Sequence, residues 1–472
     1  MTQLVVGPFN RVEGDLEVRL TLGDGAVAAA HVNSPLFRGF EAMLAGKDPR
    51  DALTVTPRIC GICSISQSMA AALALGDAAG VAPSPQGALA AAILHGAENL
   101  ADHVTHFALF FMPDFARPAY AGRPWHAAAV RRFTAMEGSA AREAVEARAR
   151  LLHIVGTLGG RWPHTGAIQP GGVTRAPSAR DAMRLRSTLA GFRRYLEGAL
   201  LGGPVEAFAD LSGIDDLMAW EGGDAGLFLR IAADLDLAGL GRGAARYLSF
   251  GAYPLAGGRV TRAGTWDGAD APLDLSGLVE DTSHAWMLGP ALHPAQGETR
   301  PDEDMRDGYT WCKAPRLDGR SFETGALARQ VVDGHPLALA LAPEGSVRAR
   351  IAGRLLEIAR TQLWLEGWVR ALDPSEGFLE PARIPREGTG VGLTEAARGA
   401  LGHWVRIENG RIARYQIVAP TTWNFSPRDA DGHPGPLEAA LVGAPVAPGD
   451  ETPVAVQHVV RSFDPCMVCT VH

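Results

Sequence analysis

The last nine residues of the chain, DPCMVCTVH (464–472), hold two cysteines in a C-x-x-C spacing and end on a histidine. A second C-x-x-C pair lies near the other end of the chain, in RICGICSISQS (58–68). Chain termini are usually mobile unless a contact holds them, and a metal shared by the two pairs would provide that contact. Only one further cysteine, Cys312, is present. The two pairs therefore predict one four-thiolate site rather than a disulfide framework.

The spacing alone does not identify the metal. C-x-x-C places two sulfur atoms about one helical turn apart, and soft thiolates select zinc, iron or nickel over magnesium or calcium. A closed, structural zinc site is one interpretation of Cys60, Cys63, Cys466 and Cys469. A catalytic nickel or iron site is the other, and the residues around the cysteines must decide between them.

The composition is that of a globular protein, with 472 residues of which 47% are hydrophobic and 20% charged. A net charge of -8 argues against a nucleic-acid partner, which favours a basic surface. We find no apolar run long enough to span a bilayer, and MTQLVVGPFNRVEGD (1–15) lacks the basic and then apolar pattern of a secretory signal. We therefore expect a cytoplasmic protein without a membrane span.

The pattern of apolar residues predicts an α+β fold that is mainly α, with a central bundle of long helices and small β elements near both termini. Alternating residues at 16–32, and Asn409-Gly410 between two alternating segments, predict β-hairpins. The stretch 203–335 is rich in Gly and Asp and predicts an irregular insertion. Because the cysteine pairs lie at opposite ends, we expect one intertwined domain over 1–472. The predicted long helices cover residues 85–112, 127–157, 177–200 and 344–372.

Several ordered motifs resemble those of nickel-iron hydrogenase large subunits. They span both ends of the chain in order, so the resemblance is far more specific than a lone C-x-x-C. It implies an enzyme that binds H2 and cleaves it heterolytically into two protons and two electrons. The matching stretches are RVEG (11–14), LFRGFE (36–41), RICGICSISQS (58–68), ADHVTHF (101–107), YTWCKAPR (309–316), EAARGALGHW (395–404), PTTWNFSPRDADGHPGP (420–436) and DPCMVCTVH (464–472).

The resemblance assigns the four cysteines to a nickel-iron centre. Cys60 and Cys466 would be terminal thiolates on nickel, while Cys63 and Cys469 would bridge nickel to an iron that carries CO and cyanide. Four anionic sulfurs would make nickel electron-rich and leave an open position where H2 is polarised. Cys469 or Cys466 would take the proton that is released.

Glu13 resembles the next proton carrier of the family. A carboxylate suits this role when burial raises its pKa toward neutrality. The alternative is an ordinary surface salt bridge with the neighbouring Arg11.

Arg398 resembles the family's arginine held over the metal centre, where its fixed cation and planar donors face cyanide or a polarised water. Asp102 would pair with Arg398 and orient it, and Thr421 resembles the residue that donates to a cyanide ligand. The alternative is that Asp102 belongs to a seam of polar side chains between packed helices. We expect His103 and His106 to lie in such a seam.

Glu41 and His472 resemble ligands of a second site that usually holds magnesium, with the backbone carbonyl of Ile417 as the third ligand. Imidazole is an unusual ligand for so hard a cation, so the identity of this metal follows from the resemblance alone.

Gln67 stands where most members of the family carry histidine. Glutamine there resembles the group that contains H2-sensing regulatory hydrogenases and some uptake enzymes, and the chain length favours the sensors. A sensor of low turnover is therefore our main prediction, and a membrane-linked or cytoplasmic uptake hydrogenase is the alternative. The loss of an imidazole beside a bridging thiolate would alter redox behaviour or turnover.

Three further departures concern the surroundings of the centre. Ile62 and Phe110 resemble bulky residues that narrow the gas channel of the sensors, and the alternative is ordinary core packing. Ala397 stands where proline commonly precedes the arginine, and we expect it to change the environment of the centre without removing it.

The electrons released from H2 need a second polypeptide, because Cys312 alone cannot hold an iron-sulfur cluster. We expect an obligatory heterodimer with an iron-sulfur small subunit, a dimer of heterodimers as a further alternative, and a histidine protein kinase as partner of a sensor. A hypothesis of a different class is a non-catalytic relative of the fold with a structural zinc site.

Overall fold

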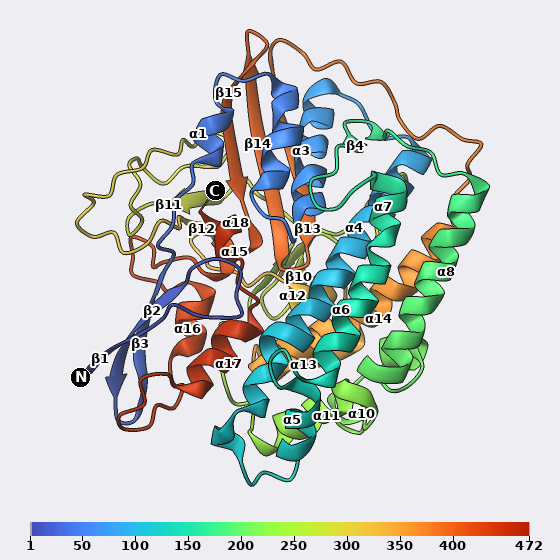
Figure 1. The fold of residues 1–472 in the computed structure, drawn as a ribbon. Coiled ribbons are helices and arrows are strands. Elements are labelled where there is room, and N and C mark those ends of the chain that lie inside the picture. The colour runs from blue at the N-terminus through green and yellow to red at the C-terminus, as the bar shows by residue number, and fades with distance from the viewer. Residues whose placement is uncertain (1, 472) are drawn as a thin grey trace.

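Long helices fill one side of the computed structural model, which describes residues 2–471, and a small N-terminal sheet lies at the opposite edge (Figure 1). The central helix α14 (Val347–Ala371) contacts α4 (Pro85–Thr105) and α8 (Ala179–Tyr195), and α8 also contacts α6 (Ser139–Leu151). Each of the three longest helices begins at a serine whose hydroxyl accepts a hydrogen bond from a backbone N–H of the first turn: Ser84, Ser178 and Ser346. The predicted fold class, α+β and mainly α, is confirmed.

Two three-stranded antiparallel sheets lie at the two ends of the chain. The first has the order β1 (Thr2–Val6), β2 (Glu17–Gly23), β3 (Ala26–Asn33), and the second β13 (Gly388–Ala396), β14 (Gly399–Glu408), β15 (Arg411–Val418). Asn409 and Gly410 both have positive φ and join β14 to β15, as the sequence predicts. The hairpin predicted at 16–32 is β2–β3.

Helix α3 (Ser64–Ala79) packs directly on strands β13 and β14 of the second sheet. Two glycines of β13 allow this close approach. A Cβ on Gly390 would lie 2.0 Å from the carbonyl oxygen of Ala74, and one on Gly392 would lie 1.9 Å from that of Ala70. The position of α3 matters because Cys63 is the residue that immediately precedes it.

The helix predicted over 127–157 is wrong as a single element. The chain forms α5 (His126–Phe133), then α6, then α7 (His153–Gly159), because a turn at 134–138 interrupts it. The N–H of Gly138 donates to the carbonyl of Thr134 at 2.7 Å, and a Cβ on Gly138 would meet the Arg132 carbonyl oxygen at 2.3 Å. Helical periodicity on both sides of a tight turn explains why the sequence does not reveal the break.

The region 203–335 holds short strands, as expected, but also four helices. The helices of the region are α9 (Val205–Ala209), α10 (Ile214–Met218), α11 (Gly223–Asp234) and α12 (Ala326–Val332). Its strands are β6 (Tyr247–Ser249), β7 (Pro254–Leu255), β8 (Gly258–Arg259), β9 (Gly264–Trp266), β10 (Asp270–Ala271), β11 (Leu278–Asp281) and β12 (Ala314–Leu317). The other elements are α1 (Phe40–Leu44), α2 (Ala52–Val55), β4 (Ile168–Gln169), β5 (Gly172–Val173), α13 (Pro336–Leu341), α15 (Pro420–Asn424), α16 (Pro436–Leu441), α17 (Val454–Ser462) and α18 (Met467–Thr470).

Segments from the two ends of the chain lie side by side in the interior. The N–H of Glu13 donates to the Pro465 carbonyl at 3.3 Å, and the N–H of Met467 donates to the Glu13 carbonyl at 2.7 Å. The Arg38 N–H donates to the carbonyl of Val471, and Figure 1 shows α18 and the C-terminal end beside α15. Among the described residues, no helix combines the length and the apolar character needed to cross a bilayer.

Candidate metal centre

The four paired cysteines meet in the interior. Their sulfur atoms all lie within 4.8 Å of one another, and all four residues are buried. The Sγ of Cys466 is 2.9 Å from that of Cys469 and 3.5 Å from that of Cys60, and Cys63 is 3.2 Å from Cys469. One ion or a compact two-metal centre could be bound by all four. Cys312, although also buried, is not a member of this group.

The electrostatics of this cluster favour a bound cation. Hydrogen bonds from the other three thiols hold the pKa of Cys60 well below its usual value. Burial raises the pKa of Cys466 and raises that of Cys469 well above its usual value. The protein alone therefore stabilises one thiolate in the group and disfavours four, whereas metal ligation requires thiolates. The donor set consequently fits a soft transition metal, which would supply the missing positive charge.

Backbone contacts fix the two cysteine segments. Cys63 directly precedes α3, and its carbonyl accepts from the Gln67 N–H at 3.1 Å. Cys466 directly precedes α18, and its N–H donates to the Thr421 hydroxyl oxygen at 3.1 Å. The Thr421 hydroxyl hydrogen is therefore available to point elsewhere, toward a ligand of the centre.

Glu98, which the sequence analysis did not single out, holds the first turn of α3. Its carboxylate accepts hydrogen bonds at 2.9 Å from the backbone N–H groups of Ile65 and Ser66, and at 3.0 Å from the Trp162 indole. These are N–H groups that a helix leaves unsatisfied at its start. Burial raises the pKa of Glu98 to about 8. The residue positions the helix that follows Cys63, and only the packing of α4 on α3 reveals it.

Glu13 lies beside this cluster, since its backbone pairs with Pro465 and Met467 on either side of Cys466. Its side chain is half-buried, and it makes no hydrogen bond or ion pair among the described residues. Burial raises the pKa of Glu13, and the negative charge of Cys60 adds to this, while Arg398 opposes it. The alternative of a salt bridge with Arg11 is wrong, because Arg11 pairs with Asp114 instead.

Arg398 pairs with two carboxylates. Its Nη1 lies 2.5 Å from Asp102 and its Nη2 lies 3.1 Å from Asp464, and all three side chains are buried. Burial raises the pKa of Asp102 to about 7, whereas Arg398 and its neighbours overcome burial and lower that of Asp464 to about 2. Arg354 lies 3.0 Å from Asp464. Asp464 is a second partner of Arg398 that the sequence analysis missed, although it stands inside the quoted C-terminal motif.

Arg329 supports the strand connection that carries Arg398. It donates to the backbone carbonyls of Ala396 at 2.8 Å and Ala397 at 2.9 Å, and it pairs with Glu357 and Glu395. Ala397, predicted to change the surroundings of the centre, is buried in this connection. No motif in the sequence indicated Arg329, since its partners come from two other segments, α14 and residues 395–397.

Gln67 contacts a histidine of the second sheet. The His403 Nε2–H donates to the Gln67 Oε1 at 2.9 Å, and the His403 Nδ1 accepts from the Tyr415 hydroxyl at 2.8 Å. All three residues are buried. An imidazole from the second sheet therefore contacts the side chain at position 67, in the first turn of α3. The sequence gives no signal for this pairing because the two residues are 336 positions apart.

The residues predicted for a second metal site are brought together only in part. The Ile417 N–H donates to the Glu41 carboxylate at 2.7 Å, and both residues are buried. His472 lies outside the described residues. Arg38 holds the adjacent tail, with its side chain donating to the Val468 carbonyl at 2.5 Å.

The remaining predicted residues lie near the centre without forming it. Ile62 packs against the core, and Phe110, in the π-helical turn His106–Phe111 that follows α4, is half-buried. His103 accepts from Arg354 and donates to Glu357 at 3.1 Å, and His106 donates to the Arg461 carbonyl at 2.6 Å. Both histidines thus lie in a buried polar seam, as the sequence analysis expects.

Comparison with known proteins gives one consistent family. The family model described as nickel-dependent hydrogenase matches residues 38–129 and 139–472. The periplasmic [NiFeSe] hydrogenase large subunit of Desulfomicrobium baculatum is 30% identical, over 100% of this chain and 95% of that protein. The hydrogenase-2 large chain of Escherichia coli is 28% identical over 100% and 97%, and the uptake hydrogenase large subunit of Rhodobacter capsulatus is 28% identical over 100% and 95%.

The fold agrees with this match. The Ni-Fe-Se hydrogenase of D. vulgaris Hildenborough in its as-isolated oxidised state superposes with a TM-score of 0.87 at 29% identity, over the full length of both chains. The reduced, active Ni-Fe-Se hydrogenase of Desulfomicrobium baculatum superposes with a TM-score of 0.86. The four buried cysteines thus belong to a chain that shares its whole architecture with solved hydrogenases.

Proposed function

The chain belongs to the nickel-dependent hydrogenase family as a large subunit, an oxidoreductase acting on H2, and we propose that it activates H2 at a nickel-iron centre bound by Cys60, Cys63, Cys466 and Cys469. The single observation that carries the proposal is the closed group of four buried sulfur atoms. When bound, the centre would supply the redox chemistry and the open position at which H2 is polarised. CO and cyanide on the iron are part of this proposal.

The proton released would be moved by residues of this chain. The Sγ of Cys469 accepts it first, and the Glu13 carboxylate receives it next and passes it toward the surface. A raised pKa suits Glu13 for this transfer, because a carboxyl near neutrality both takes and releases protons at working pH. Arg398, held by Asp102 and Asp464, keeps a fixed positive charge beside the centre. The Thr421 hydroxyl donates to an acceptor on the centre.

Magnesium at Glu41, the Ile417 carbonyl and His472 remains a proposal of the same kind. It is supported by the contact between Glu41 and Ile417 and by the nearby path of the C-terminal tail. Removal of the metal by a chelator would be expected to loosen this tail. The experiment is metal analysis of the purified protein together with proteolysis from the C-terminus before and after chelation.

The partner is a small subunit, as for hydrogenase large subunits generally, and we propose that it carries the iron-sulfur clusters that receive the electrons. Electron transfer out of the chain is needed because Cys312 is the only cysteine left after the four ligands. The dimer of heterodimers and the cytoplasmic location stay predictions.

Uptake, in which H2 is oxidised to feed electrons to a respiratory or cytoplasmic acceptor, is the function that the relatives support better than sensing. The proteins compared above are named as hydrogenases, one of them as an uptake enzyme, and none of those four is named as a sensor. Our main expectation of an H2 sensor with a kinase partner is therefore replaced by the uptake alternative. Gln67 in contact with His403 is the one observation that keeps sensing as a second candidate.

Two experiments test these proposals. Infrared spectra of the purified heterodimer should contain stretching bands of CO and cyanide, and metal analysis should find nickel and iron; zinc without these bands would overturn the nickel-iron assignment.

Deletion of the chain in its host should abolish H2-dependent growth if it works in uptake. Loss of H2-dependent transcription with normal growth on H2 would instead establish the sensor.

A further inference from the structure

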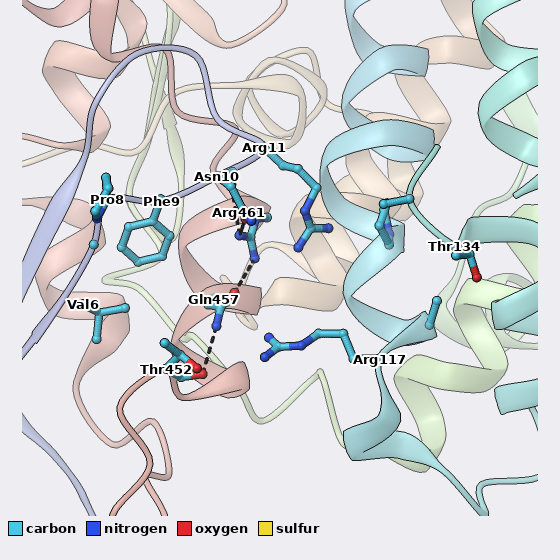
Figure 2. A pocket seen from close by; sticks show the side chains of 14 residues that line it. Val6, Pro8, Phe9, Asn10, Arg11, Arg117, Thr134, Thr452, Gln457 and Arg461 are labelled. Carbon is cyan, nitrogen blue, oxygen red and sulfur yellow. Dashed lines mark hydrogen bonds between the residues drawn. The ribbon is translucent and has the colours of Figure 1, made fainter. Parts of the chain in front are cut away.

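A cavity of about 480 Å³ opens beside the segment that leads to Glu13. We call it the arginine cavity, because Arg11, Arg117 and Arg461 reach it from three separate segments of the chain (Figure 2). It is distinct from the four-cysteine group, none of whose members lines it. Its other lining residues are apolar or neutral, and include Asn10, Thr134 and Gln457.

The charges around this cavity do not balance. Arg461 lies 2.5 Å from Asp114, and Arg11 pairs with the same carboxylate. The guanidinium of Arg117 makes no hydrogen bond or ion pair with any described residue. No acidic residue lines the cavity. Arg11 and Arg461 share the buried carboxylate of Asp114, and Arg117 has no carboxylate partner among the described residues.

Neighbouring titratable groups do not restore the balance. His458 lies 3.8 Å from Asp114, but burial lowers its pKa to about 4, so that it is neutral at physiological pH. Burial also lowers the pKa of Arg461, and the charge of Arg11 adds to this lowering, although the group stays cationic. The buried Nε of Arg461 has no hydrogen-bond partner among the described residues. Such a site gains from a negative charge that enters the cavity.

Two of the three cations, Arg11 and Arg461, are held in place before any ligand arrives. Arg461 donates to the carbonyl and side-chain oxygens of Asn10 at 3.0 and 2.8 Å, and its Nη1 also donates to Gln457. Arg11 donates to the Phe110 carbonyl at 3.1 Å. Because these side chains are already ordered, a ligand would lose little binding free energy to their immobilisation.

We propose that the arginine cavity binds one carboxylate or phosphate-type group, which pairs with the free guanidinium of Arg117 and is further attracted by Arg11 and Arg461. Planar guanidinium donors match both kinds of oxyanion. The group could belong to a small anion in solution or to an acidic side chain of the small subunit. This site is independent of the nickel-iron centre, although its ligand would bind beside the backbone that carries Glu13.

The test compares Arg117→Gln with Arg186→Gln in the purified heterodimer. Arg186 is an exposed residue of α8 that makes no hydrogen bond or ion pair with any described residue and does not line the cavity, so its substitution is a control for the change in net charge. Titration calorimetry with inorganic phosphate and with acetate at low salt measures binding. Loss of one charge-assisted contact should weaken binding at least about tenfold in Arg117→Gln and leave it unchanged in Arg186→Gln. Arg117→Lys, which keeps the charge, should restore part of the affinity.

The two sources of the anion give different results. A free anion would bind the wild-type heterodimer and raise its melting temperature, and both effects would be lost in Arg117→Gln. An acidic side chain of the small subunit would block phosphate and acetate, but Arg117→Gln would then raise the dissociation constant of the two subunits at least about tenfold. Equal anion binding and equal subunit affinity in Arg117→Gln and Arg186→Gln would overturn the proposal.

Discussion

The network around Arg398 and the arginine cavity are both built from arginines and carboxylates, but their charges are balanced differently. In the first, Arg398 is matched by Asp102 and Asp464, and Arg329 is matched by Glu357 and Glu395. In the second, Arg11 and Arg461 share Asp114, and Arg117 has no partner. Each arginine of the first network therefore has carboxylate partners within the chain, whereas in the second Arg117 has none among the described residues.

This difference in charge balance suits the two regions to different tasks: the first holds side chains in position, and the second binds an anion. A balanced, buried network holds its members in one geometry, which suits a group that must keep a fixed charge beside a metal centre. An unbalanced group that opens to solvent instead attracts a ligand. Substitutions in and around the two regions test this contrast.

Cys466→Ser should have the greatest effect. It removes a thiolate that the four-sulfur site requires, so nickel content, CO and cyanide bands and H2 oxidation should all fall below detection. Anion binding at the arginine cavity should be unchanged, because no cysteine lines it. Cys312→Ser is the matched control, since this buried thiol lies outside the cluster. Normal nickel content in Cys466→Ser would contradict the proposed ligand set.

Glu13→Gln should lower H2 oxidation about 10²- to 10⁴-fold, the range expected when a positioned proton carrier is lost. The infrared bands and the heterodimer should persist, since the amide keeps the shape of the side chain. Glu17→Gln, a neighbouring carboxylate on β2, should have no such effect.

The pH dependence of the wild type gives a second readout for Glu13. Its raised pKa means that the carboxyl stays protonated to a higher pH than usual. Because it must be deprotonated to accept a proton, the rate should rise as pH rises through this pKa. That limb of the profile should be absent in Glu13→Gln, and an unchanged limb would assign it to another group.

Asp114→Asn should destabilise the protein by about 3–5 kcal/mol, since it leaves the buried guanidinium of Arg461 and the partly buried one of Arg11 without their carboxylate. Inorganic phosphate should restore part of the melting temperature, because it can enter the arginine cavity. Asp464→Asn should cost a similar amount, but phosphate should give no rescue there, as that network is fully buried. Equal rescue of both variants would remove the distinction between the two regions.

The pH dependence of the free energy of unfolding shows whether the ionised Asp114 carboxylate stabilises the fold. Although burial opposes its ionisation, Arg461 and the other cations lower the pKa of Asp114 below its unfolded value. A carboxyl with a depressed pKa stabilises the fold above its unfolded pKa of about 3.9, and this contribution is lost as pH falls toward the folded pKa. Melting temperatures below pH 4 should therefore converge for wild type and Asp114→Asn.

Gln67→His should have the smallest effect, a change in turnover of less than about tenfold, or about 1.4 kcal/mol in the activation barrier. Histidine at this position would compete with His403 for the same space and could restore a titratable group near Cys63. An increase in turnover would support the view that glutamine limits catalysis, as a sensor requires. An unchanged rate, with Gln67→Ala as the comparison, would favour uptake.

The two cysteine pairs and the hairpin at Asn409-Gly410 could both be read from the sequence. Each depends on residues that are close together in the chain, so spacing and local backbone preference are sufficient to predict them. The motifs around the cysteines likewise pointed to Glu13, Arg398 and Asp102. The family match supports the activity that these motifs implied.

Asp464, Arg329, Glu98 and the unpaired Arg117 could not be predicted, because their roles depend on which distant side chains lie opposite them. The break between α5 and α6 also depended on a tight contact between Gly138 and the preceding helix rather than on composition. Local chemistry therefore specified which atoms could bind a metal. The tertiary packing selected the partner of each buried charge, because the free energy of a buried ion depends on the groups within a few ångströms and not on its sequence neighbours.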